Sequence, residues 1–272
     1  MINLLKVDLI RVFKDKLFLI VSIIAVAFAL FTPILYKFMM EMLAVEEDAL
    51  LMLGVGFDAK SMFFRSFAPG DNMGLIAPIL IGIVLCKDFS HGTIRNKLIC
   101  GKSRVAVFLS MLITCAIVLN VVMLLGAIVT LLTSLIFFEY QSTPFTLADF
   151  GYLLLSVGFE ILVYCFIGSL VAFLCASMKN VGLVIVLYVA ISFVFVIFGS
   201  VVMVMLSMAT NPQALSYKVL EFLANANPFT STLIGSVQYG WRELLYVLVP
   251  TVGGTAVFSA FGILALKKRD LK

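Results

Sequence analysis

Six long apolar runs dominate the pattern of hydrophobic and polar residues along the chain. They occupy residues 17–38, 74–86, 105–137, 152–177, 181–208 and 244–266. Most of them reach the roughly 20 residues that an α-helix needs to cross the hydrocarbon core of a bilayer. The strands of a membrane barrel would instead alternate in polarity over segments of about ten residues. The pattern therefore predicts an all-α membrane protein with six transmembrane helices.

Two of these runs differ in length from a simple span. The second, residues 74–86, has thirteen residues and is too short to cross a bilayer alone. We expect its helix to kink at Pro78 and to continue past Cys86. The third, residues 105–137, would rise about 50 Å as one helix. We expect it to protrude from the bilayer or to break near residues 130–134.

Two further segments have helical periodicity but are too polar to span a membrane. Residues 1–16 precede the first run with apolar side chains at three- and four-residue spacing, which predicts an interfacial amphipathic helix rather than a cleaved signal peptide. Whether this helix only anchors the chain or also holds a partner stays open at this point. Residues 209–243 predict short helices half-inserted in the outer leaflet. The apolar positions expected on the first helix are Ile2, Leu5, Leu9 and Val12.

The composition agrees with a membrane protein. Hydrophobic residues make up 63% of the chain and charged residues 12%, and the mean hydropathy is +1.17. No internal repeat or low-complexity linker divides the sequence, so we expect a single transmembrane domain over residues 1–272. The cysteines lie within or beside the apolar runs and only one histidine is present, which predicts neither a disulfide framework nor a zinc site. We expect the lipid bilayer, and no nucleic acid, among the binding partners.

The basic residues are distributed unevenly between the connecting segments. Fourteen of the nineteen lie in the N-terminal segment, in residues 87–104, at Lys179 and at the C-terminus, where only four acidic residues occur. The rest of the chain carries five basic and eleven acidic residues. The positive-inside rule therefore places both termini and residues 87–104 in the cytoplasm. The acidic residues between positions 41 and 48 then lie outside, either as a solvated loop face or as a divalent-cation site.

Glu160 is an ionisable residue deep within an apolar run. About 15 Å of helix separates it from Phe150, which places it near the middle of a membrane. An ionisable group at this depth costs at least a few kcal/mol, so it should face the bundle or a water-filled path. We expect Glu160 either to line a translocation path or dimer seam, or to form a structural hydrogen bond with another span. Asn120 is the candidate partner.

Residues 87–104, KDFSHGTIRNKLICGKSR, form the one strongly basic and polar stretch between two long apolar runs. The letters Gly101-Lys102-Ser103 match the end of a phosphate-binding P-loop. That motif also requires a preceding strand and a glycine five positions earlier, where this chain has Asn96. We therefore expect no nucleotide binding and no enzymatic ATP hydrolysis by this chain.

The same stretch predicts a short amphipathic helix. Ile94 and Leu98 are four residues apart and can share an apolar face, while Thr93 is a suitable N-cap and Gly101 a suitable end. Such a helix could fit a groove on a soluble partner. It could equally be an interfacial helix that only covers the membrane face.

The run Asp88-Phe89-Ser90-His91-Gly92-Thr93-Ile94-Arg95, followed by Leu98 and by Ser103-Arg104, resembles a known motif. It is similar to the cytoplasmic loop of ABC-2-type transporter permeases, whose pattern is roughly E-F-x-x-G-T-[LI]-R-x-x-L followed by x-x-P-x-S-R. Asp88 stands where the family usually has glutamate, and Gly101 where it often has proline. The six spans, the interfacial N-terminal helix and the half-inserted helices before the last span extend the resemblance over the whole chain.

The resemblance implies a fold, partners and a location. The fold would be that of ABC-2, or type V, exporters, embedded in the bacterial cytoplasmic membrane with both termini inside. Such permeases pair as homodimers or with a related permease, and bind two copies of a separate ABC ATPase that carries the ATP and magnesium; this chain itself would hold no cofactor. By the resemblance, the residues that couple to the ATPase are Gly92, Thr93, Ile94, Arg95 and Leu98. Asp88 and His91 would lie at the cytoplasmic gate.

The expected function is export of an amphipathic or hydrophobic substrate. The short chain, the apolar interior and the lack of a large outer domain favour a peptide or peptide antibiotic over a long polysaccharide. Two other classes stay open at this point. An ion-coupled transporter or channel would use Glu160, although the paired repeats typical of such folds are not evident. A non-transporting membrane scaffold or immunity protein could share the topology.

Overall fold

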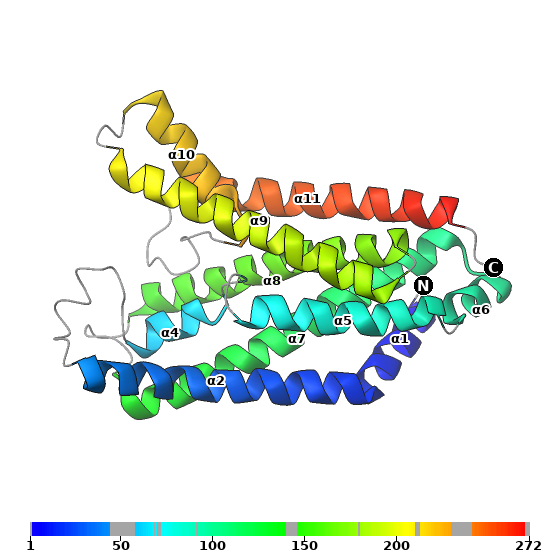
Figure 1. Ribbon diagram of the computed structural model, residues 1–272, viewed down its shortest axis with the longest axis horizontal. Helices are drawn as coiled ribbons and strands as arrows, with labels where there is room; N and C mark the ends of the chain where they lie inside the picture. The colour runs from blue at the N-terminus through cyan, green and yellow to red at the C-terminus, as the bar shows by residue number, and fades with distance from the viewer. Residues whose placement is uncertain are drawn as a thin grey trace.

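The computed structural model describes most of the chain. The described residues are 2–43, 58–67, 69, 72–90, 92–139, 146–178, 180–209, 213–229 and 241–269. Within them the chain is almost entirely helical, without strands. Figure 1 shows the helices packed side by side along the long axis of the molecule. They are α1 (Ile2–Lys14), α2 (Lys16–Leu43), α4 (Ala59–Arg65), α5 (Asn72–Ser90), α6 (Thr93–Ile99), α7 (Arg104–Phe137), α8 (Leu147–Ser177), α9 (Val181–Met208), α10 (Leu215–Ala226) and α11 (Trp241–Lys268).

Several of these helices could cross a membrane. In the described part of the chain, α2, α7, α8, α9 and α11 are each long and apolar enough to do so. A sixth span is formed if α5 and α6, which meet at an angle of 52°, are counted as one broken span. The all-helical prediction is confirmed, and the chain has the character of a multi-pass membrane protein.

The core of the bundle is built around α8. In its most apolar stretch 78% of the residues are buried, against 22% in α2 and 17% in both α9 and α11. In Figure 1, α8 lies with α5 and α7 between α2 and the pair α9 and α11. The outer helices expose apolar side chains such as Phe31, Phe193 and Phe261. Apolar side chains on the outside are expected where the solvent is lipid.

Capping residues explain where the long helices begin. Ser103 starts α7 by accepting a hydrogen bond from the backbone N–H of Ala106, at 3.2 Å. Thr146 and Asp149 form a reciprocal capping box at the start of α8. The Asn180 side chain accepts from the N–H of Gly182 at the start of α9. These side chains satisfy backbone donors that have no partner within the first helical turn.

The third apolar run does not break. The chain remains helical through residues 130–134, so the predicted break is wrong and α7 extends to Phe137. Thr133 and Ser134 donate their hydroxyl hydrogens to Val129 O and Leu131 O within the same helix, which satisfies both groups without interrupting it. The shorter second run extends past Cys86 as expected, because α5 continues to Ser90.

Two short helices lie at the end of the bundle away from α6 (Figure 1). The amphipathic helix α10 confirms one helix predicted within residues 209–243; residues 230–240 lie outside the described part. The helix α4 was not predicted, because its seven residues are too few for a periodic signal. Asp58 caps it by accepting from the N–H of Ser61, and the N–H of Ala59 donates to Glu139 O at 2.9 Å.

Candidate functional site

The candidate coupling helix α6 lies at the same end of the bundle as both chain termini (Figure 1). Gly92 precedes it with a φ of 69°, in the left-handed region that glycine adopts without strain. This residue, rather than Thr93, is the N-cap, so the predicted cap is wrong by one position. A threonine there would be strained by its Cβ atom, whereas glycine allows the sharp turn between α5 and α6.

The end of α6 is as the sequence predicted. The helix stops at Ile99, and Gly101 follows with a φ of 80°. The N–H of Gly101 donates to Leu98 O at 3.0 Å, and the N–H of Lys102 donates to Lys97 O at 3.3 Å. These two bonds form a Schellman motif, which satisfies the last carbonyl groups of the helix. The loop is therefore a defined helix with fixed ends.

A buried carboxylate joins α6 to α1 and α7. Asp8, on α1, is only 3% exposed. It accepts a hydrogen bond from Lys97 Nζ on α6 at 2.6 Å and another from Ser110 Oγ on α7 at 2.7 Å. Arg11 Nη2 lies 3.8 Å from the same carboxylate. Charge-assisted hydrogen bonds are among the stronger polar contacts in proteins, so these three helices are firmly linked.

A second set of ion pairs joins α1 to α5. Arg11 donates to the carboxylate of Asp88 near the end of α5. Lys87, one residue earlier, lies 3.9 Å from Asp15 between α1 and α2. Asp88, expected at a cytoplasmic gate, is thus largely buried in an ion pair with the N-terminal helix. The other expected gate residue, His91, lies outside the described part of the chain.

An apolar cluster completes the junction. Leu4 of α1, Ile94 of α6 and Val107 of α7 are buried against one another, with Phe89 and Leu98 packed around them. Ile94 is only 2% exposed. It therefore faces α1 and does not form an outward apolar contact for a soluble partner. Leu98 is half-buried in the same cluster. Gly92 and Thr93, at the start of the helix, are also half-buried.

Two arginines attach the C-terminal end of α11 to this junction. Arg104 donates to the carbonyl groups of Leu266, Lys267 and Arg269. Arg269 in turn donates to Cys175 O at 2.8 Å and lies 4.1 Å above the ring of Phe89. Partial burial lowers the pKa of Arg269, but a guanidinium stays charged at neutral pH. The ends of α5, α7, α8 and α11 are thereby held together.

The opposite side of α6 faces outward. Arg95, Asn96, Ile99 and Cys100 are exposed, and we call these four residues the α6 outer face. Ile99 is 72% exposed although it is a large apolar residue. An exposed apolar side chain beside an arginine is typical of a small contact surface. Arg95 is among the coupling residues that the resemblance implies, whereas Ile99 is not.

The buried face of the N-terminal helix α1 differs from the apolar face predicted from the sequence. The buried positions are Leu4, Asp8 and Val12, four residues apart, whereas Ile2 is 81% exposed. Asp8 lies on the buried face because Lys97 and Ser110 satisfy its carboxylate. The register of Asp8 with two apolar residues is a signal in the sequence for its burial, although it does not identify the residues that satisfy the carboxylate.

Glu160 and Asn120 form no hydrogen bond with each other. Glu160 is 2% exposed, and neither of its carboxylate oxygens has a hydrogen-bond partner in the described part of the chain. The amide of Asn120 donates to Ala116 O in its own helix, at 2.8 Å, and approaches the Cys165 sulfur at 4.0 Å. The alternative in which Glu160 forms a structural hydrogen bond with Asn120 is therefore wrong, and a place for Glu160 in a translocation path or dimer seam stays a prediction. Glu160 also lies about 25 Å of helix from the end of α8, away from the α6 junction.

Cys86 and Cys175 meet where α5 packs on α8. Their sulfur atoms are 3.3 Å apart, and both thiols are free. The structure shows no cluster of three metal-ligating side chains among the residues it describes. Of the expected acidic cluster, Glu41 lies in α2, 3.7 Å from Lys37, and the other members fall in the undescribed stretch at residues 44–57.

The sequence matches a known protein family. A family model described as "Protein of unknown function (DUF2705)" matches residues 59–272, from α4 to the end of the chain. The match includes α6 and its attachments on α7 and α11, whereas α1 and α2 precede it. No curated protein matches the sequence.

Proposed function

This chain belongs to the DUF2705 family, and we propose that it is the transmembrane permease subunit of an ATP-driven exporter of the ABC-2 type. A separate ABC ATPase would supply the energy by binding the α6 outer face. The observation that carries this proposal is the arrangement of α6, whose inner side is fixed to α1 and α7 while its outer side is free in the described structure. The resemblance of residues 88–104 to the permease loop supports the same assignment.

The contacts of α6 offer a route for force into the membrane. A partner that moves α6 also moves α1 through Lys97 and Asp8, and moves α7 through Ser110. The Asp88–Arg11 ion pair connects α5 to the same unit. Closure of two ATPase subunits would therefore tilt α5 and α7 together with the N-terminal helix. Rigid-body movement of packed helices is an established way to switch a transporter between two states.

The charge distribution supports a cytoplasmic position for α6. Basic residues such as Lys6, Lys14 and Lys102 are exposed at the end of the bundle that carries both termini. The positive-inside rule assigns such an end to the cytoplasm. In the proposed assembly two copies of this permease, or this permease and a related one, bind two ATPase subunits. The short chain, the apolar interior and the lack of a large outer domain favour an amphipathic peptide as the substrate class.

Replacing the basic and apolar side chains of the α6 outer face with acidic ones should disrupt the complex with the ATPase. We expect Arg95→Glu with Ile99→Asp to lower the amount of ABC ATPase that co-purifies by about tenfold, because central interface residues contribute more than 1 kcal/mol each. The measurement is the ATPase recovered with the tagged permease after co-expression and solubilisation.

A matched control lies on α1. Ile2 and Lys6 are also exposed, four residues apart, and belong to the same end of the bundle. Ile2→Asp with Lys6→Glu makes the same chemical changes away from α6 and should leave ATPase recovery unchanged. Equal recovery with both double variants, or no ATPase recovered with the unaltered permease, contradicts the proposal.

A second candidate function is ion-coupled transport. It is favoured by one observation, the buried carboxyl group of Glu160 without a hydrogen-bond partner among the described residues, since such groups inside membranes commonly mark ion or proton sites. Transport that persists without any ATPase and is abolished by Glu160→Gln would favour this function over the ATP-driven one.

A further inference from the structure

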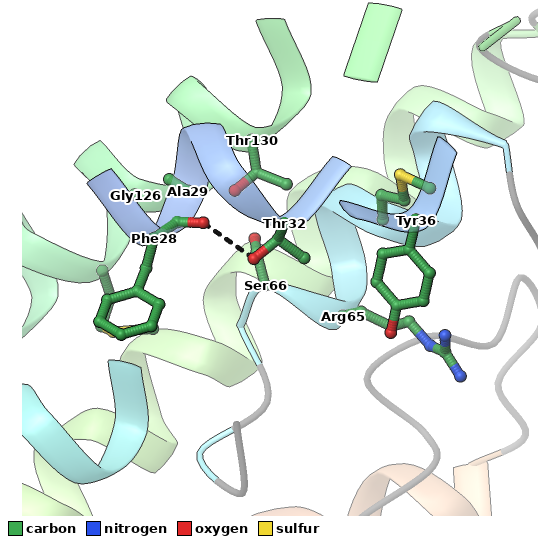
Figure 2. A pocket seen from close by; sticks show the side chains of 10 residues that line it. Phe28, Ala29, Thr32, Tyr36, Arg65, Ser66, Gly126 and Thr130 are labelled. Atoms are coloured by element: carbon green, nitrogen blue, oxygen red, sulfur yellow. Dashed lines mark hydrogen bonds between the residues drawn. The ribbon is translucent and has the colours of Figure 1, made fainter. Parts of the chain in front are cut away.

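A cavity of about 150 Å³ lies between α2, α4 and α7. It belongs to the end of the bundle away from α6, and Figure 2 shows it from close by. Along α2, Phe28 lies about 18 Å and Tyr36 about 30 Å from the start of the helix at Lys16. Because a hydrocarbon core is about 30 Å thick, the cavity extends from the middle of the span to its far boundary.

The chemistry of the cavity changes along its length. In Figure 2 the ring of Phe28 lies at one side of the cavity, and Tyr36 and Arg65 lie together at the other. Met62 and Met123 add apolar surface to the lining. Between the two sides, Thr32 donates its hydroxyl hydrogen to Phe28 O at 2.8 Å and Ser66 donates to Phe63 O at 2.6 Å. Both hydroxyl hydrogens are therefore already used. The cavity thus suits a ligand with one apolar part and one polar head.

Arg65 determines the sign of that head. It is the one charged side chain among the described residues that line the cavity. Lys37 and Lys60, the neighbouring basic residues on α2 and α4, are paired with Glu41 at 3.7 Å and with Asp149 at 3.4 Å. Arg65 forms no ion pair within the described structure. An exposed guanidinium without a carboxylate partner favours a carboxylate or phosphate.

The size of the cavity limits the apolar part. A cavity of about 150 Å³ accepts a molecule the size of benzene, which corresponds to a short stretch of one hydrocarbon chain. The rest of such a chain could continue along the lipid-facing side of α2, where Phe31 and Leu35 are exposed. The two methionines that line the cavity are flexible enough to adapt to a chain.

We propose that this cavity binds the acidic head and the first chain segment of a single-tail or two-tail membrane amphiphile, with Arg65 pairing with its carboxylate or phosphate. A fatty acid and an acidic phospholipid share this chemistry. The site does not rest on the proposed transport function, because it lies away from α6 and needs no ATPase.

Gly126 provides a way to fill the cavity. It is buried and lines the cavity, yet a Cβ atom at this position would meet no atom within 4 Å. Gly126→Leu should therefore occupy the space without displacing backbone. Gly158 on α8 also has open space around its Cβ position but does not line the cavity, so Gly158→Leu is the matched control.

The test is photolabelling of the full-length protein in phosphatidylcholine nanodiscs. The probes are a diazirine-bearing palmitic acid, a phosphatidylglycerol with a diazirine in its acyl chain, and the uncharged alcohol of the first probe, followed by mass spectrometry of the labelled peptides. We expect at least one acidic probe to label the peptides of α2, α4 or α7 that line the cavity about tenfold more than the alcohol does. Labelling by the palmitic acid probe indicates that a fatty acid carboxylate can supply the acidic head. Labelling only by the phosphatidylglycerol probe indicates a phospholipid phosphate. Either result supports the site.

Arg65→Gln and Gly126→Leu should each reduce this labelling about tenfold, while Arg65→Lys and Gly158→Leu should retain most of it. Arg65 is exposed, so the Gln and Lys variants remain a valid pair even if Gly126→Leu does not fold. Equal labelling by the acids and the alcohol overturns the proposal. Undiminished acid labelling of Arg65→Gln also overturns it.

Discussion

Replacement of Asp8 by leucine should destabilise the protein by about 3–5 kcal/mol, the cost of leaving one member of a buried ion pair without its partner. Lys97 Nζ lies 2.6 Å from Asp8, and both side chains are largely buried. Without the carboxylate, the ammonium of Lys97 and the hydroxyl of Ser110 lose their acceptor in a part of the protein with little access to water. The measurement is denaturant or thermal unfolding of the purified protein in detergent.

The same contact can be tested by a double-mutant cycle. Asp8→Leu combined with Lys97→Met replaces both charged groups with apolar ones of similar length, and should recover most of the lost stability because no charge remains unpaired. If the double variant is as unstable as the sum of the two single variants, Asp8 and Lys97 are not coupled. That result would contradict the described packing of α1, α6 and α7 around Asp8.

Replacement of Gly168 by leucine should separate the two central helices, with a cost of about 3 kcal/mol. A Cβ atom at Gly168 would lie 3.3 Å from the backbone nitrogen and 3.4 Å from the Cα atom of Ala116 on α7. Backbone atoms in the middle of a helix cannot move away as the end of a side chain can. The same unfolding measurement detects the effect.

Gly158→Leu, on the same helix, is the control for this substitution. No atom lies within 4 Å of its Cβ position, so the added side chain projects from the bundle. Its effect on stability should lie between no change and a gain of about 1 kcal/mol, because glycine disfavours a helix interior. Equal losses of stability in Gly158→Leu and Gly168→Leu would show that α7 and α8 do not cross closely at Gly168.

The positions of the long helices could be predicted from the sequence because lipid imposes a strict condition on the backbone. A segment in hydrocarbon must satisfy its own N–H and C=O groups, so each long apolar run becomes a helix of nearly the same extent. The run predicted at residues 181–208 coincides with α9. Hydroxyl residues in the third run carried no break signal, since Thr133 and Ser134 bond to their own helix.

The faces of the helices could be predicted only in part. The expected apolar stripe of α1 did not include Asp8, whose partner Lys97 lies 89 positions away in the chain. Local periodicity contains no information about such a pair. For the same reason the sequence offers Asn120 as a candidate hydrogen-bond partner of Glu160, although its amide is satisfied by Ala116 in its own helix. Tertiary contacts decide which polar groups are buried.

The position of the loop helix α6 was predicted correctly from the sequence, but the prediction of which of its side chains face outward was wrong. Ile94 matches the motif and was expected to contact a partner, yet it is buried against Leu4 and Val107. The orientation of a seven-residue helix depends on the turn at Gly92, which a sequence pattern does not specify. The contact surface proposed for the ATPase is therefore the α6 outer face.

Cross-linking from Cys100 tests the proposed contact between α6 and an ABC ATPase most directly. Cys100 is the exposed cysteine, whereas the other four are buried or half-buried. In membranes that contain both subunits, a thiol-reactive photocrosslinker attached to Cys100 should give a covalent product of permease and ATPase. The product should be absent in Cys100→Ser and depleted in Arg95→Glu. Labelling of Cys100 by an impermeant reagent applied outside intact cells, or Cys100 products that never contain the ATPase, would contradict the account.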